Sequence, residues 1–175
     1  MKNIIYSLTF ILSGCALLIE GPKDSAGEGN WVKVGSSILG IVKKYEITNV
    51  KPNDPKEWII EGFPSGAYTV GFNYSENQCK SEISSLWINF SISSKEKIIV
   101  NESGFLEEQE FGFGPPGDEP YYSLLDDTNN ERLIVGLTPD VKYNVKFFWK
   151  QVGSEVNDCS MTLKFLISKL HFGAK

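Results

Sequence analysis

The chain has 175 residues, of which 41% are hydrophobic and 22% charged, and its formal net charge at pH 7 is −5. This length fits one domain with a sizeable hydrophobic core. The acidic balance disfavours nucleic acid and anionic headgroups as partners, and it favours solubility or a basic protein partner.

The first 14 residues are predicted to be a signal peptide. Lys2 supplies a positive charge, and the apolar run that follows, residues 4–12, is too short to cross a bilayer as a helix. The run ends in Leu12-Ser13-Gly14-Cys15, which resembles the lipobox of bacterial lipoproteins. The resemblance implies cleavage before Cys15 and lipid on its sulfur. Because Ala16 follows rather than aspartate, it also implies an outer-membrane anchor facing the periplasm. The alternative is a hydrophobic first strand with a chance cysteine.

Residues 15–30 are expected to form a lipidated, flexible tether. Several glycines, a proline and charged residues are interspersed there, a composition typical of linkers. The folded domain is therefore expected to comprise residues 31–175.

From residue 31 onward, apolar and polar residues alternate with a period of two, as in half-buried strands. Strands are expected at residues 31–34, 38–50, 58–61, 68–74, 86–92, 97–100, 132–136, 141–149 and 161–168. Turns are expected at residues 52–55, 64–66, 101–104 and 138–140, and no convincing amphipathic helix is present. This pattern predicts an all-β fold, an antiparallel β-sandwich of Ig-like or jelly-roll-like type with about eight to ten strands.

A weak internal repeat divides the domain into two halves. Residues 59–64 lead to Tyr68, then Cys79 and an alternating strand, while residues 134–139 lead to Tyr143, then Cys159 and another such strand. If the halves occupy equivalent places in two sheets, the cysteines meet near one end. The alternative is chance, because glycine, proline and alternation recur in any β protein.

The segment 137–143 also resembles the Leu-x-Pro-x-x-x-Tyr corner of fibronectin type III sandwiches. The resemblance implies that the hydroxyl of Tyr143 hydrogen-bonds a nearby backbone group. It covers only this short segment and concerns the fold alone.

Cys79 and Cys159 remain as an even pair once Cys15 carries lipid. In an exported chain such a pair predicts a disulfide. It would close a loop of about 80 residues and contribute roughly 4 kcal/mol in the loop-entropy model. The alternative is two unpaired, buried thiols.

The segment 104–122 mixes carboxylates, aromatic rings, glycine and proline, and its Pro-Pro-Gly at 115–117 must leave the sheet. Loops on a rigid sandwich often carry binding residues, and aromatic side chains supply contact area. The alternative is a covering loop in which Phe105, Phe111 and Tyr121 are core residues. The candidate binding residues are Glu107, Glu108, Glu110, Phe111, Phe113, Asp118, Glu119, Tyr121 and Tyr122.

Catalytic signatures are sparse. The one histidine, His171, lies close to the end, and no phosphate-binding glycine loop or dinucleotide fingerprint occurs. Residues 126–131 offer oxygen ligands but match no EF-hand, and a glycosidase-type carboxylate pair near Glu107 lacks supporting residues. We therefore expect no enzyme activity, cofactor or metal.

The sequence as a whole predicts a membrane-anchored binding module of the cell envelope. The leading hypothesis is recognition of a protein partner, for example by an inhibitor or immunity-type lipoprotein whose acidic face meets a basic protein. The alternative is a binder of carbohydrate or envelope polymer. That alternative requires an exposed tryptophan among Trp31, Trp58, Trp87 and Trp149.

Overall fold

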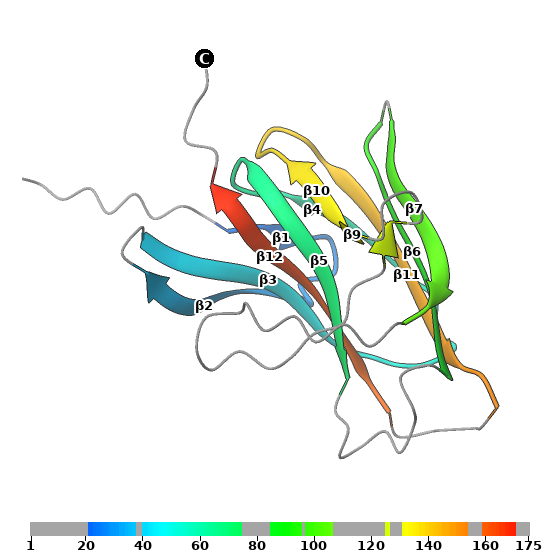
Figure 1. Ribbon diagram of the computed structural model, residues 1–175. Coiled ribbons are helices and arrows are strands. Elements are labelled where there is room, and N and C mark those ends of the chain that lie inside the picture. Colours follow the sequence, from blue (N-terminus) through cyan, green and yellow to red (C-terminus); the bar gives the residue numbers. More distant parts are fainter. Residues whose placement is uncertain are drawn as a thin grey trace, which may run out of the picture.

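The computed structural model describes residues 21–37, 40–74, 85–95, 97–106, 125–126, 131–153 and 159–170. These residues form two five-stranded sheets (Figure 1). In order across the sheet, sheet A consists of β1 (Lys23–Asp24), β4 (Lys56–Glu61), β11 (Tyr143–Gln151), β6 (Leu86–Ser93) and β7 (Ile98–Phe105). Sheet B consists of β10 (Ile134–Leu137), β5 (Gly66–Tyr74), β12 (Met161–Leu170), β3 (Gly40–Val50) and β2 (Gly29–Ser37). A separate pair joins β8 (Leu125–Asp126) to β9 (Glu131–Arg132).

All strand pairs in the described residues are antiparallel, so the expected all-β sandwich is confirmed. Each expected strand is present, with its ends shifted by a few residues. One expected turn is wrong, because residues 101–104 lie within β7. Strand β7 pairs with β6 as far as the pair Trp87–Phe105, and this ladder outweighs the turn tendency of the Asn, Ser and Gly residues there.

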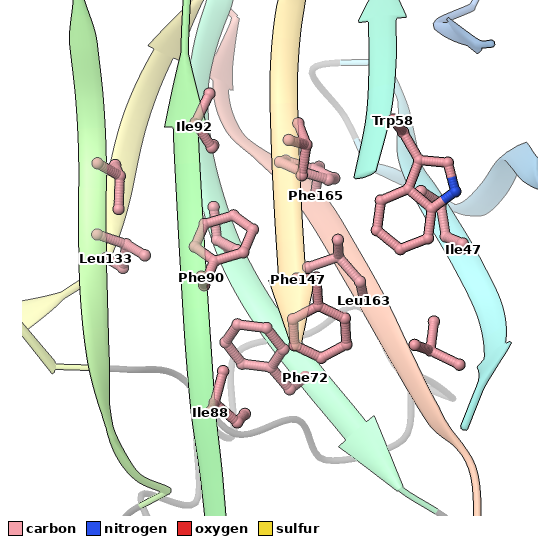
Figure 2. Close-up of a cluster of buried hydrophobic side chains, with 14 of the residues drawn as sticks. Ile47, Trp58, Phe72, Ile88, Phe90, Ile92, Leu133, Phe147, Leu163 and Phe165 are labelled. Atoms are coloured by element: carbon pink, nitrogen blue, oxygen red, sulfur yellow. The ribbon is translucent and has the colours of Figure 1, made fainter. Parts of the chain in front are cut away.

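The core lies between the sheets and is rich in aromatic side chains (Figure 2). Phe72 of sheet B stacks on Phe147 of sheet A at a centroid distance of 5.3 Å, and it meets Phe90 edge-on at 5.7 Å. Successive side chains of a strand point to opposite faces, so the alternate, apolar side chains of each strand point into the core between the sheets. The buried hydrophobic residues include Ile47, Trp58, Ile60, Phe63, Val70, Ile88, Ile92, Val145, Trp149, Leu163 and Phe165.

The two halves of the internal repeat occupy equivalent places in opposite sheets. Strand β11 lies between β4 and β6 in sheet A, and strand β5 lies between β10 and β12 in sheet B. We call β4-β11-β6 and β10-β5-β12 the two triplets. The first half of the repeat provides β4 and β6, which flank the sheet A triplet, and β5, the centre of the sheet B triplet. The second half provides β10 and β12, which flank the sheet B triplet, and β11, the centre of the sheet A triplet. This interleaving gives the sequence repeat a structural counterpart.

The two repeat tyrosines make matching contacts at the starts of the central strands. The hydroxyl of Tyr68 donates to the carbonyl of Pro64 at 2.7 Å. The hydroxyl of Tyr143 accepts from the backbone N–H of Thr138 at 2.8 Å, which is the corner that the fibronectin-like segment implies. Phe63 packs edge-on against both rings. Both halves are thus fixed by a tyrosine bonded to its own upstream turn.

The expected tether is wrong for residues 21–30. These residues belong to the sandwich, because β1 pairs with β4, β2 begins at Gly29 and Pro22 is buried. The indole N–H of Trp58 also donates to the carboxylate of Glu28 at 2.7 Å. Glycine-rich composition predicts flexibility, but specific hydrogen bonds fix this segment to the sheets. Residues 15–20 lie outside the described residues.

Asp24 holds this N-terminal segment in place. Its carboxylate accepts hydrogen bonds from the backbone N–H groups of Ala26, Glu28 and Gly29 at 2.9, 3.1 and 2.7 Å, and from the hydroxyl of Tyr45 at 2.7 Å. Burial and the neighbouring carboxylate raise the pKa of Tyr45, so its hydroxyl stays a donor. One side chain thereby orders the loop between β1 and β2 and ties it to β3.

The Asp24 network predicts a dependence of stability on acid. Burial alone would raise the pKa of Asp24, but the hydrogen bonds from Tyr45 and from the backbone at Gly29, Glu28 and Ala26 outweigh it and lower the pKa below 3.8. A carboxylate with a lowered pKa stabilises the fold above its ordinary pKa, and the stabilisation is lost as pH falls through the lowered value.

We therefore expect Asp24→Asn to lower the urea midpoint at pH 7, with the difference from wild type shrinking as pH falls below 3.8 and through the lowered pKa of Asp24. The exposed Asp140→Asn is the matched control and should leave the urea midpoint at pH 7 near that of wild type. A wild-type profile parallel to that of Asp24→Asn would show that the network does not act in this way.

Candidate functional site

The residues singled out by the sequence lie largely outside the described part of the chain. Cys15, Cys79 and the candidate binding loop from Glu107 to Tyr122 all fall outside it. The strands that flank these segments lie within the described part.

One end of the sandwich, which we name the loop pole, is where these strands end or begin. Gln151 pairs with Leu86, Trp87 pairs with Phe105, and Met161 pairs with Tyr74. The chain leaves the described residues here after Tyr74, and it does so again just beyond β7 and β11 (Figure 1). The segment with Cys79, the candidate loop and the segment before Cys159 therefore all start from the loop pole.

The opposite end, named the entry pole, receives the N-terminal part of the chain. Lys23 pairs with Glu61 at the end of β4, and a Cβ built on Gly62 would lie 3.6 Å from the carbonyl oxygen of Gly21. Since β4 ends beside Tyr143, where β11 starts, Gly21 lies at the pole remote from Gln151. The described chain thus enters the sandwich at one end and sends its long connections out of the other.

Cys159 lies at the loop pole, two residues before β12, and is only 1% exposed. It is disulfide-bonded. Since Met161 pairs with Tyr74, Cys159 is placed just past the end of β5, the strand that leads to Cys79. The cysteine with which it pairs lies outside the described residues.

Beside the loop pole, the outer face of sheet A carries an aromatic cluster that we define as Trp87, Phe105 and Phe148. Trp87 lies directly opposite Phe105 on the neighbouring strand, and its ring meets that of Phe148 edge-on at 6.2 Å. The ammonium of Lys150 lies 5.0 Å from the centre of the Trp87 ring, a cation–π geometry. Phe105 is 51% exposed, so the alternative that placed it in the core is wrong.

The aromatic cluster was not among the predicted site residues. From the sequence, Trp87 is one of four tryptophans that could serve as a carbohydrate platform, and Phe105 is an alternative core residue. The sequence nevertheless holds a signal for Trp87 and Phe148, because each is a large aromatic residue at an otherwise polar position of an alternating strand. Their meeting with Phe105 depends on strand register, which alternation does not supply.

The four tryptophans differ in exposure. Trp58 and Trp149 are buried at 1% and 0% exposure, and the indole N–H of Trp149 donates to the carbonyl of Val50 at 3.0 Å. Trp31 is partly buried and packs against the core. Trp87 is the described tryptophan that lies on the outer face of sheet A, so the carbohydrate alternative keeps one candidate platform there.

The outer faces of the two sheets differ. On β12 of sheet B, Lys164 and Leu166 are only 5% and 9% exposed although they point away from the core, and Thr69 of β5 is 3% exposed. On sheet A the corresponding side chains of β6 and β7 are half-exposed or exposed. The outer face of sheet A is thus the more accessible one.

Other possible sites in the described residues carry little chemistry. An open cleft of about 360 Å³ at the entry pole is lined by Ser94, Lys95, Asp140, Val141 and Lys142. Its serine hydroxyl faces the carbonyl of Lys97 at 3.5 Å. The part of the chain that the structure describes holds no group of three or more metal-ligating side chains, and no helix of a length and apolarity that would cross a membrane.

Comparisons of the chain with protein-family models, with curated proteins and with solved structures found no match. Function must therefore be inferred from the chemistry and geometry of the chain itself.

Proposed function

We propose that the protein is a non-catalytic binding module of the bacterial cell envelope, anchored by lipid on Cys15 and binding a protein partner at the loop pole. The observation that carries the proposal is the placement of the poles. The chain enters the sandwich at Gly21, and the candidate loop starts at the opposite end, after β7. Cys15 lies six positions before Gly21, which spans at most about 22 Å. An anchored domain would therefore face the membrane with its entry pole and face outward with its loop pole.

The distribution of charge favours a basic partner. The three segments that start from the loop pole, residues 75–84, 107–124 and 154–158, contain one basic residue, Lys80. They contain nine acidic residues: Glu76, Glu82, Glu107, Glu108, Glu110, Asp118, Glu119, Glu155 and Asp158. Such a concentration of like charge speeds association with an oppositely charged protein and disfavours nucleic acid.

A Cys79–Cys159 disulfide is part of the proposal. It would link the segment after β5 to the segment before β12, both of which start from the loop pole. The buried, disulfide-bonded state of Cys159 and the pairing of Met161 with Tyr74 support it. A cross-link there would hold the base of the binding end rigid, which lowers the entropy lost on binding.

The partner proposal is tested by comparing two variants with equal charge change. The first carries Glu107→Gln, Glu108→Gln and Glu110→Gln; the control carries Glu57→Gln, Glu61→Gln and Asp140→Asn. Full-length protein is immobilised at low salt, a partner is captured from an envelope extract, and its purified form is titrated by interferometry. We expect the loop variant to bind about ten-fold more weakly and with a flatter salt dependence, and the control to bind like wild type. No saturable partner, or equal losses in both variants, would refute the proposal.

The anchor makes a separate prediction about localisation. Cys15→Ser removes the thiol to which lipid attaches, so we expect the protein to shift from the membrane pellet to the soluble envelope fraction. Intact mass should show an acylated chain beginning at Cys15 in the wild type only. A wild-type chain that starts at Met1 would overturn the anchor and the envelope location together.

A carbohydrate or envelope-polymer binder is the second candidate. The position of Trp87 on an accessible sheet face favours it.

A further inference from the structure

We propose that the outer face of sheet A is a second binding surface, on which the aromatic cluster and the adjoining amide and hydroxyl groups bind a neutral oligosaccharide. This surface consists of described residues only. It does not depend on the partner proposed at the loop pole.

The surface is built by the register of three strands. Across β11, β6 and β7, Lys150 lies opposite Trp87, which lies opposite Phe105. In the next row Phe148 lies opposite Asn89, which lies opposite Ser103. The outward side chains therefore form rows, with aromatic rings toward the loop pole and small polar groups farther along.

The outward side chains of β6 and β7 indicate the kind of ligand, because Glu102 of β7 lies opposite Phe90 in the other phase of the strand. Their outward or exposed side chains, none of which ionises, are Trp87, Asn89, Ser91, Ser93, Ile98, Asn101, Ser103 and Phe105. Among the outward side chains, charged groups begin only at β11, and toward β4 they are paired: Lys146 lies 3.7 Å from Glu57, and Asn144 donates to Glu57 at 2.6 Å. Lys150 is the cation beside the aromatic rings, and its ammonium lies over Trp87, so the side chains that β6 and β7 contribute match an uncharged ligand.

The chemistry of the rows matches that of a sugar polymer. Aromatic rings bury the apolar C–H face of a pyranose, while amides and hydroxyls both donate to and accept from sugar hydroxyl groups. Phe105 is 51% exposed and offers a free ring surface, while Phe148 and Lys150, both on β11, contact the indole of Trp87. The indole of Trp87 is therefore held in position before the ligand arrives, which reduces the entropy lost on binding.

The experiment measures binding of two neutral hexasaccharides, β-1,4-linked N-acetylglucosamine and α-1,4-linked glucose, by titration calorimetry. Full-length protein is used in a detergent without a sugar headgroup. We expect saturable binding of at least one of them by wild type, binding about ten-fold weaker for Phe105→Ala and for Trp87→Ala, and retention by Phe105→Tyr. Ile134→Ala is the matched control, because Ile134 is 55% exposed on sheet B, and it should bind like wild type.

Three results would overturn the proposal: no saturable binding of either hexasaccharide at millimolar concentration, unchanged binding by Phe105→Ala, or an equal loss in Ile134→Ala. If Phe105→Ala weakens only the captured protein partner, the face belongs to a protein interface and the glycan proposal is wrong. The triple Gln variant of the candidate loop separates the two proposals, because it should lose the protein partner and keep the oligosaccharide. Since Phe105 is exposed, its replacement should leave the thermal midpoint near that of wild type.

Discussion

Replacing Phe63 by Ala is expected to lower the free energy of unfolding by about 3–5 kcal/mol, which is the usual cost of removing a buried phenyl ring. Phe63 is 1% exposed and follows β4 where the chain crosses from sheet A to sheet B. Its ring contacts aromatic rings from both sheets: Tyr45 at 5.6 Å, Tyr68 at 5.2 Å, Tyr143 at 6.0 Å and Phe165 at 5.3 Å.

The cost should fall at the high end of that range. The four rings around Phe63 belong to both sheets, so they could fill the cavity left by its ring only if the two sheets shifted. Both repeat tyrosines also lose their common neighbour. Urea unfolding followed by circular dichroism gives the measurement, and Phe105→Ala, at an exposed position, is the control that should change stability by less than about 0.5 kcal/mol. A cost for Phe63→Ala below about 1.5 kcal/mol would mean that the cluster repacks freely.

Reduction of the proposed Cys79–Cys159 disulfide is expected to lower stability by about 4 kcal/mol, since it frees a loop of roughly 80 residues in the unfolded state. The double variant Cys79→Ala, Cys159→Ala should show a similar loss that is insensitive to reductant. Because Cys159→Ala alone would leave an unpaired thiol at Cys79, the double variant is the one compared with wild type, before and after reduction. If reductant leaves the wild-type urea midpoint unchanged, the bond makes no contribution. If Cys79 is alkylated without reduction, the pairing itself is wrong.

Period-two alternation was sufficient to predict the strands and the sandwich, because burial on one face of a sheet leaves a direct trace in the sequence. The turn expected at residues 101–104 shows the limit of reading local composition. Asn, Ser and Gly suggest a turn there, yet the partner strand β6 continues alongside and holds them in β7. Local preference is weak beside a long hydrogen-bonded ladder.

The N-terminal segment shows why composition failed where geometry mattered. Glycines near Asp24 suggest a linker. The carboxylate of Asp24, however, accepts hydrogen bonds from three backbone N–H groups and a tyrosine hydroxyl, and these contacts cannot be predicted without the fold. The aromatic cluster is a second such case. Trp87, Phe105 and Phe148 lie on three strands, and only register brings them together.

The interleaved triplets have a consequence for how the chain folds. Neither half of the repeat contains a complete sheet: β5 has both neighbours, β10 and β12, from the second half, and β11 has both, β4 and β6, from the first. Neither sheet core can form until chain segments more than 60 residues apart have met, as in the pairing of Thr69 with Ile134. High contact order of this kind slows folding. The same geometry would let two separately produced halves complete each other, each lending the strand that the other lacks.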